Sequence, residues 1–351
     1  MITIFTPSFA DASNTNAQNL TVKEVVARLS PERFRVRMLY SSAPDARITA
    51  RPNTELLAYG GSGNSARLLA HLLRTRPDIY FFPREGPLDA AFFFLRRYLR
   101  LRTAIVTYVV ATQERETSKV LARAIREGDT VVGNSEYVSE TIQQQYGVES
   151  ATIHSGIGRE IFYPLPEGSR LERAQLTVLY AGSFQARKRA HLVIEEASKW
   201  PQVQFRLAGR GEEEAPCRLL AQRLGCGNVE FLGHLSPSEL GEEMRKADVF
   251  LFPSVIEGHP QVLGQAAACG LPCVAMEIYR PDYVVNGVTG FLVRSEFELS
   301  QRLEWLLTQP ELRQTMAAAA VQLSLKFDWE RVVESWAGVF ERVVEQRQGK
   351  R

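Results

Sequence analysis

A carboxylate, a glycine and a histidine stand together at Glu257, Gly258 and His259, directly before Pro260. An apolar run precedes this loop, and a helical pattern that stops at Gly270 follows it. Because proline is favoured at the first position of a helix, we predict that Pro260 begins a helix. The amides and the positive dipole at the start of that helix suit a diphosphate, and Gly258 lets the backbone approach it closely. The loop therefore predicts a site for a phosphorylated ligand.

Three consecutive cations, Arg187, Lys188 and Arg189, follow the strand and glycine turn of residues 178–182. Cations just beyond the carboxyl end of a strand are well placed to neutralise phosphate groups. A solvated run of charges on a surface turn is the alternative. The pattern alone is compatible with both interpretations.

Both halves of the chain alternate short apolar runs with amphipathic helical stretches, the pattern of βαβ units on a parallel sheet. The predicted strands are residues 2–5, 34–39, 79–82, 104–110, 130–132 and 151–154, then 178–181, 205–208, 229–232, 249–252 and 273–275. We therefore expect an α/β protein with two doubly wound sheets. Since ligands bind outside the carboxyl ends of such strands, two such sheets facing each other should place ligands on opposite walls of one cleft.

The polar segment 165–175 carries proline, glycine and charges in place of an apolar period, and we place the domain boundary there. The expected domains are residues 1–165 and 176–327. In the remaining segment 328–351, Trp329, Val332, Trp336 and Phe340 stand near helical spacing. This spacing predicts a closing amphipathic helix.

The composition, 45% hydrophobic and 23% charged over 351 residues, is that of a globular protein. A net charge of +2 argues against a nucleic-acid partner. No stretch resembles a signal peptide or a membrane span, so we expect a cytoplasmic protein. The cysteines form no C-x-x-C pair, and we expect buried thiols in place of a zinc site or disulfides; they are Cys217, Cys226, Cys269 and Cys273.

From about Val178 to Val293 the chain resembles the retaining glycosyltransferases of family four, which have the GT-B fold of two Rossmann-like domains facing across a cleft. The motifs that carry this resemblance are E-G-H-P at 257–260, L-A-G-R-G at 207–211, F-L-G at 231–233, A-D-V at 247–249 and N-G-V-T-G-F at 286–291. The stretches V-V-G-N-S at 131–135 and H-S-G-I-G-R-E-I-F-Y-P at 154–164 resemble the closing strands and hinge of the N-terminal domain.

The resemblance implies transfer of a hexose-type sugar from a UDP- or GDP-sugar to a hydroxyl acceptor, with retention and with no cofactor or metal. The acceptor would be a sugar, a lipid-linked compound or another hydroxyl compound of glycan or glycoconjugate biosynthesis. Glu257 would contact the transferred sugar and Lys188 the diphosphate, and these are the two implied catalytic residues. The implied donor-binding residues are Gly182, Ser183, Arg187, Lys188, Gly209, Gly258, His259, Pro260, Gln261, Val262 and Gln265.

Three positions depart from the family pattern. Gln265 stands where a second glutamate is expected, Ser183 replaces an arginine, and no histidine follows the strand at 104–110. Glutamine can still bind ribose hydroxyls without charge-assisted hydrogen bonds, and Arg187 or Arg189 could supply the missing cation. A weak or inactive relative that serves as a binding subunit therefore stays open, as does a GT-B sugar-nucleotide epimerase or phosphorylase.

The chemistry that these residues permit is stabilisation of a leaving group. The sequence offers no identifiable pair of carboxylates of the kind that retaining hydrolases use. It offers cations and amides that can stabilise charge on a departing diphosphate. Because no D-x-D motif occurs and Lys188 can neutralise charge, we expect no requirement for a divalent ion.

The first half offers weaker candidates. The polar residues Asn14, Thr15 and Asn16 follow the first strand, where they could contact an acceptor, although an exposed polar loop fits equally well. The segment 90–102 mixes aromatic residues with four arginines and could make a weak peripheral contact with an anionic membrane at the inner face. An ordinary helix with a solvated outer face is the stronger interpretation of that segment.

Overall fold

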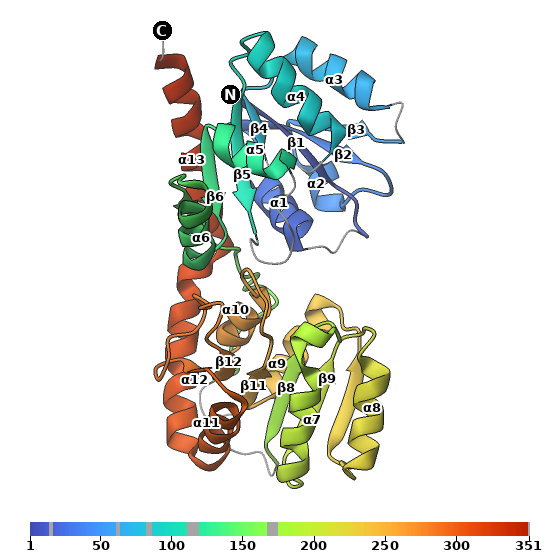
Figure 1. Ribbon diagram of the computed structural model, residues 1–351, viewed down its shortest axis with the longest axis vertical. Helices are drawn as coiled ribbons and strands as arrows, with labels where there is room; N and C mark the ends of the chain where they lie inside the picture. Colours follow the sequence, from blue (N-terminus) through green and yellow to red (C-terminus); the bar gives the residue numbers. More distant parts are fainter. Residues whose placement is uncertain (14–16, 61–63, 82–85, 111–118, 167–174, 350–351) are drawn as a thin grey trace. The chain divides into compact units, whose positions relative to one another are not determined.

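The computed structural model of the protein describes residues 1–13, 17–60, 64–81, 86–110, 119–166 and 175–349. The acceptor candidates Asn14, Thr15 and Asn16 lie outside these residues. Contacts divide the chain into a first unit, Met1–Ser155 with Trp329–Arg351, and a second unit, Gly156–Asp328 (Figure 1). No described helix is both long and apolar enough to cross a membrane.

The first unit contains a seven-stranded parallel sheet in the order β3-β2-β1-β4-β5-β6-β7. Its strands are β1 (Ile2–Phe9), β2 (Phe34–Tyr40), β3 (Thr54–Ala58), β4 (Ile79–Phe81), β5 (Ala104–Val109), β6 (Thr130–Gly133) and β7 (Ala151–Thr152). Its helices are α1 (Ala17–Arg28), α2 (Ala46–Ala50), α3 (Asn64–Thr75), α4 (Pro87–Tyr98), α5 (Lys119–Glu127), α6 (Glu136–Tyr146) and α13 (Trp329–Gly349).

The second unit contains a six-stranded parallel sheet in the order β10-β9-β8-β11-β12-β13. Its strands are β8 (Thr177–Ala181), β9 (Gln204–Ala208), β10 (Val229–Gly233), β11 (Val249–Phe252), β12 (Cys273–Met276) and β13 (Gly290–Val293). Its helical segments are η1 (Ala186–Lys188), α7 (Ala190–Lys199), α8 (Glu214–Arg223), α9 (Pro237–Lys246), α10 (Gln261–Ala268), α11 (Glu296–Thr308), α12 (Pro310–Ser324) and η2 (Leu325–Phe327). The chain builds outward from β8 and then returns to β11, so β8 and β11 flank the switch point where ligands bind in such sheets.

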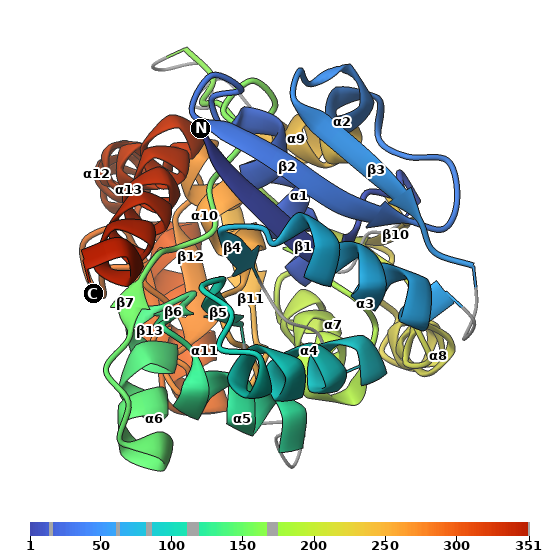
Figure 2. The ribbon, with the colours of Figure 1, turned by 90° about the horizontal axis from the view of Figure 1, so that it is seen from above.

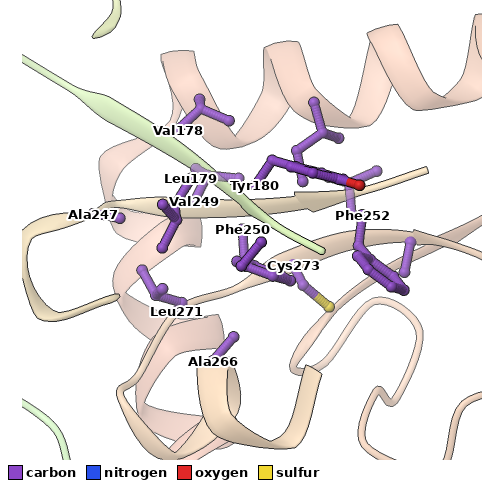
Figure 3. Close-up of a cluster of buried hydrophobic side chains, with 14 of the residues drawn as sticks. Val178, Leu179, Tyr180, Ala247, Val249, Phe250, Phe252, Ala266, Leu271 and Cys273 are labelled. Atoms are coloured by element: carbon purple, nitrogen blue, oxygen red, sulfur yellow. The ribbon is translucent and has the colours of Figure 1, made fainter. Parts of the chain in front are cut away.

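The core of the second unit surrounds this switch point. Leu179 and Tyr180 of β8 lie beside Phe250 of β11, and Ala266 of α10 lies close to them (Figure 3). All four are fully buried. Parallel strands that are covered on both faces are apolar along their whole length. The apolar runs at 178–181 and 249–252 therefore predict these strands.

Each predicted strand corresponds to a strand of the structure, but β3 and β13 were not predicted. Strand β3 lies at the edge of the first sheet and is only partly buried, so Thr54 and Glu55 interrupt its apolar pattern. Strand β13 is a four-residue edge strand that directly follows a turn. Short edge strands carry little of the periodicity on which the prediction rests.

The division between the units falls earlier than the polar segment 165–175. Ile157 and Phe162 belong to the hydrophobic core of the second unit. Arg245 of α9 donates to the carbonyl oxygen of Ile161 at 2.8 Å and stacks over the ring of Tyr163 at 4.2 Å. The residues that precede the polar segment therefore pack on the second sheet.

Helix α13 belongs to the first unit. Its apolar face is buried as the spacing predicts, with Trp336 fully buried. The Trp336 ring meets Phe81 of β4 and Tyr108 of β5 edge-on, at centroid distances of 5.0 and 5.2 Å. In the second unit the amide of Ile157 donates to the carbonyl of Phe327 at 2.8 Å, so the two chain connections leave that unit side by side.

Candidate functional site

Lys188 and Glu257 meet at the switch point of the second sheet. Lys188 lies in η1 after β8, Glu257 lies in the loop after β11, and the Lys188 ammonium forms an ion pair with Glu257 Oε1. Ser254 Oγ donates to the same oxygen at 2.6 Å, and Arg187 Nη1 lies 3.5 Å from it. The side chains of Lys188 and Glu257 are only 12% and 10% exposed. Among the described residues, Glu257 Oε2 takes part in no hydrogen bond.

Arg187 ties the loop after β8 to the loop after β11. Its Nη1 donates to the carbonyl of Ile256 at 2.7 Å, and its own carbonyl accepts from the amide of Val255 at 3.1 Å. Its Nε donates to Gln185 Oε1 at 3.1 Å. Glu257 is therefore held by a network that also fixes the backbone of the two residues before it, Val255 and Ile256.

Arg189 faces a different neighbour. It has a left-handed backbone with φ of 52°, and its guanidinium forms an ion pair with Glu296 of α11. Of the three consecutive cations, Arg187 and Lys188 thus contact Glu257, and Arg189 does not. The expectation that Arg189 could replace the cation missing at Ser183 does not fit this geometry.

Close backbone contacts join the turns that follow β8 and β9. Gly209 has φ of +136°, and a Cβ atom there would lie 1.8 Å from the carbonyl oxygen of Gly182. The amide of Gly209 donates to the carbonyl of Gly233 at 2.7 Å. The amide of Phe184 donates to the carbonyl of Arg210 at 2.9 Å. Glycine at 209 therefore lets the turns lie against one another at the carboxyl edge of the sheet.

Helix α10 begins at Gln261, one residue after the predicted start, and Pro260 is its N-cap with φ of −72°. Its end agrees with the prediction, because Gly270 adopts φ of +68° and its amide donates to the carbonyl of Ala267 at 2.9 Å. The amides of the first turn, which includes Val262, point toward the N-terminal end of the helix. The loop carrying Glu257 and Gly258 leads directly into this end.

The His259 side chain packs into the protein. It is fully buried, its ring centroid lies 4.1 Å from that of Tyr283, and its Nδ1 lies 3.8 Å from Asp282 Oδ2. Tyr283 also meets Phe327 edge-on at 4.6 Å. A ligand could therefore reach the backbone of His259 but not its ring.

Several neighbours of the site were not predicted from the sequence. A Cβ on Gly264 would lie 2.6 Å from the Tyr283 ring, so this glycine lets α10 approach the aromatic cluster. Burial, with the charge of Glu257, raises the pKa of Tyr180 and Tyr279. Tyr180 Oη donates to the carbonyl of Ser183 at 3.1 Å. No motif spacing connects residues this far apart, so the sequence carried no signal for them.

Gln265 lies on α10 one turn after Gln261. Its side chain is half-buried and makes no hydrogen bond with the described residues. Ser183, also half-buried, is fixed through its backbone carbonyl. Both positions where the family pattern has a charge are thus half-buried neutral residues.

The cysteine side chains differ in character from the charged network around Glu257. Burial raises the pKa of Cys217 to about 11 and that of Cys273 to about 12, so both are protonated at neutral pH. Cys269 is also buried, and Cys226 is half-buried. In the part of the chain that the structure describes, no group of three or more His, Cys, Asp or Glu side chains could hold a metal ion.

Two doubly wound parallel sheets in one chain are the architecture of the GT-B class of fold. The chain is similar to the Anabaena protein HepE in complex with UDP and glucose, with a TM-score of 0.76 and 20% identity over 97% of this chain and 99% of that one. It is also similar to sucrose-phosphate synthase from Thermosynechococcus elongatus, with a TM-score of 0.78 and 18% identity over 99% and 100% of the chains. The predicted α/β fold class is confirmed.

Residues 166–322 match the family glycosyl transferases group 1. An uncharacterized glycosyltransferase of Methanocaldococcus jannaschii is 25% identical over 223 residues, which are 63% of this chain and 61% of that protein. The D-inositol 3-phosphate glycosyltransferase of Streptomyces bingchenggensis is 28% identical over 263 residues, covering 66% and 58%. The matches thus span 61% and 58% of the length of these relatives. The similar structures show the GT-B fold, and the family match covers residues 166–322.

Proposed function

We propose that this chain is a retaining glycosyltransferase that moves a hexose-type sugar from a UDP- or GDP-sugar to a hydroxyl acceptor. The observation that carries the proposal is the state of Glu257. Lys188 and Ser254 hold its Oε1, while its Oε2 makes no hydrogen bond with the described residues. A carboxylate fixed in this way can accept hydrogen bonds from sugar hydroxyls, each worth about 1.5–3 kcal/mol because the acceptor is charged.

The diphosphate would lie between the turn at Gly182 and the first turn of α10. Lys188, Arg187 and the helix amides would offset the charge that builds on the leaving group, which is how such groups accelerate transfer. The bond from the anomeric carbon to the diphosphate breaks as the acceptor oxygen bonds to the same face of that carbon. The hydroxyl proton passes to a donor phosphate oxygen. Because these side chains and amides supply the positive charge, the step as proposed needs no divalent ion.

The ribose would lie against Gln265. This side chain is half-buried on the helix that starts the phosphate site, and an amide can both donate to and accept from hydroxyl groups. Glutamine makes weaker hydrogen bonds to hydroxyls than a carboxylate does. We therefore propose a donor site that binds the sugar and phosphates more strongly than the ribose.

Calorimetric titration with UDP and GDP tests the donor site. We expect at least one diphosphate to bind, and Lys188→Ala to weaken its binding about tenfold or more through the loss of a charged contact. Lys199→Ala is the matched control, because Lys199 is an exposed lysine of α7 that pairs with Glu196. If neither diphosphate binds, or if both variants weaken binding equally, the donor-site assignment is wrong.

Donor hydrolysis in the absence of acceptor tests the enzymatic proposal against a binding subunit. We expect slow release of sugar from one nucleotide sugar, which a thermal-shift screen can select because a bound ligand raises the melting temperature. Nuclear magnetic resonance of the first sugar released should show the donor's anomeric configuration. Binding without any turnover would favour the binding-subunit alternative, and the inverted anomer would contradict retention.

A further inference from the structure

The outer face of α4 exposes large apolar side chains. Phe94 is 60% exposed, Tyr98 is 75% exposed and Leu99 is 47% exposed. The rings of Phe94 and Tyr98 stack on one another, with centroids 6.2 Å apart and planes 6° from parallel. The inner face of the same helix is anchored, because Phe92 and Phe93 are buried in the core. The packing of this helix therefore does not require the exposed rings of Phe94 and Tyr98.

Exposed arginines lie at the ends of this helix and of its neighbour α3. They are Arg97, Arg100 and Arg102 at the end of α4, with Arg74 and Arg76 at the end of α3. None of them forms an ion pair with a described residue, whereas Arg96 of the same helix pairs with Asp129. Asp129 also forms an ion pair with Arg347, so its carboxylate does not neutralise the exposed arginines. The positive charge at this end of the unit is thus uncompensated among the described residues.

The ends of α3 and α4 lie together. The two helices are neighbours on one face of the first sheet, and both views show them side by side (Figures 1 and 2). Thr103 Oγ1, just after the α4 arginines, donates to the carbonyl of Pro77, just after the α3 arginines, at 2.7 Å. The arginines of both helices therefore contribute to one surface.

The backbone adds a further observation. Arg76 and Arg100 end their helices in the left-handed conformation, with φ of 39° and 49°. Glycine is the least strained residue at such a position, yet both are arginines. Attraction between a cation and a helix C-terminus can account for Arg97. It cannot account for exposed rings at Phe94 and Tyr98.

We propose that this surface docks on an anionic lipid bilayer. We call it the aromatic–arginine patch; its members are Phe94, Arg97, Tyr98, Leu99, Arg100 and Arg102. Aromatic rings favour the headgroup level of a bilayer, and arginines are attracted to the negative potential of anionic lipids. The charge selects anionic lipid over an apolar protein surface, because the three arginines of the patch, with Arg74 and Arg76 at the end of α3, would lose water against a neutral partner and gain no counter-charge.

Vesicle flotation with the full chain tests the proposal. We expect the protein to float with vesicles of phosphatidylcholine and phosphatidylglycerol at low ionic strength, and not with phosphatidylcholine alone. The variant Arg97→Gln, Arg100→Gln, Arg102→Gln should lower the partition coefficient about a hundredfold, because each arginine near the surface contributes about fivefold. The variant Phe94→Ser, Tyr98→Ser should also weaken flotation, and high salt should weaken that of the wild type.

Matched variants distinguish the patch from charge in general. Arg223→Gln, Arg331→Gln, Arg342→Gln removes three exposed arginines outside the patch, and Phe297→Ser removes a ring that is 77% exposed in the second unit. Both should float like the wild type. The proposal is overturned if the wild type does not float, if it floats equally on neutral vesicles, or if the control triple variant loses as much as the patch triple variant.

A second readout places the contact at the patch itself. In the Phe94→Trp variant, brominated lipids should quench tryptophan emission beyond the quenching of the wild type's own tryptophans. Quenching no greater than that of the wild type would mean that another surface docks. Neither readout depends on nucleotide binding or turnover, so the proposed donor site can fail while this inference stands, and the reverse.

Discussion

The charge balance around Glu257 suits the diphosphate donor that we propose. Lys188 and Arg187 both face a single carboxylate, so the cluster carries one net positive charge before any ligand arrives. Tyr180 and Tyr279 do not change that balance, because burial and the charge of Glu257 raise their pKa values and keep both hydroxyls neutral. A diphosphate bound there would add its negative charge beside these two cations.

Glu257→Gln separates the charge of this carboxylate from its shape. We expect donor hydrolysis to fall about tenfold to a hundredfold, because the amide forfeits charged hydrogen bonds to the sugar and to Lys188. The measurement is release of sugar from the donor found in the thermal screen. Glu296→Gln, which breaks the exposed pair with Arg189, is the control and should leave the rate unchanged. Equal losses in the two variants would place the sugar away from Glu257.

Part of the candidate site was predictable from single residues. Glu257 and Lys188 stand in motifs whose order along the chain matches the order of strands around the switch point. The outcome at Arg189 was not predictable, because its left-handed backbone and its partner Glu296 send the third cation elsewhere. That partner lies far along the chain, and no local pattern records such a contact.

At the scale of elements, the strands that surround the site were the easiest to predict. β8 and β11 are covered on both faces, so their sequences are continuous apolar runs. β3 and β13 were missed because they are short edge strands with mixed patterns. The packing of α10 against Tyr283 was missed for another reason. It depends on Gly264, and a glycine inside a helix gives no sign of the ring that lies against it.

Gly264→Ala tests whether this packing sets the position of α10. Alanine should add about 1 kcal/mol of helix propensity, but its Cβ would lie 2.6 Å from the Tyr283 ring. Tyr283 is held between His259 and Phe327 and has no space to move, so overpacking at about 1–3 kcal/mol should exceed the gain. We expect a net loss of up to about 2 kcal/mol in the free energy of unfolding, measured with urea.

Two further variants make that result specific. Gly227→Ala is the control, because a Cβ there meets nothing within 4 Å, and it should leave stability almost unchanged. Adding Tyr283→Leu to Gly264→Ala should cost less than the sum of the two single changes, because the smaller side chain relieves the contact. Strict additivity would show that α10 does not depend on this contact.

At the scale of the whole molecule, the chain enters the second unit once and returns to the first. The amide of Ile157 and the carbonyl of Phe327 join the two connections where they leave the second unit. The polar segment 165–175 was predicted as the domain boundary because its composition is typical of a surface loop. Composition does not record that residues just before it, such as Phe162, are already buried in the second core.

Helix α13 follows from the same topology, and its role is testable. Trp336 is fully buried between Phe81 and Tyr108, so Trp336→Ala should lower the stability of the first unit by about 3–5 kcal/mol. Hydrogen exchange followed by mass spectrometry should show lost protection in β1, β4, β5 and α13. Protection in β8 and β11 should persist, because the second unit has a core of its own.

Trp305→Ala is the counterpart in the second unit. Trp305 lies on α11, is 37% exposed and meets Phe291 edge-on at 5.8 Å. Its removal should cost less stability than removal of Trp336, since less area returns to water, and the loss of protection should centre on β13 and α11.

If Trp336→Ala instead loosened the second unit, or both units together, α13 would stabilise the whole chain. If protection falls in the first unit alone, α13 is a structural helix of that unit, and the first sheet depends on the packing of α13.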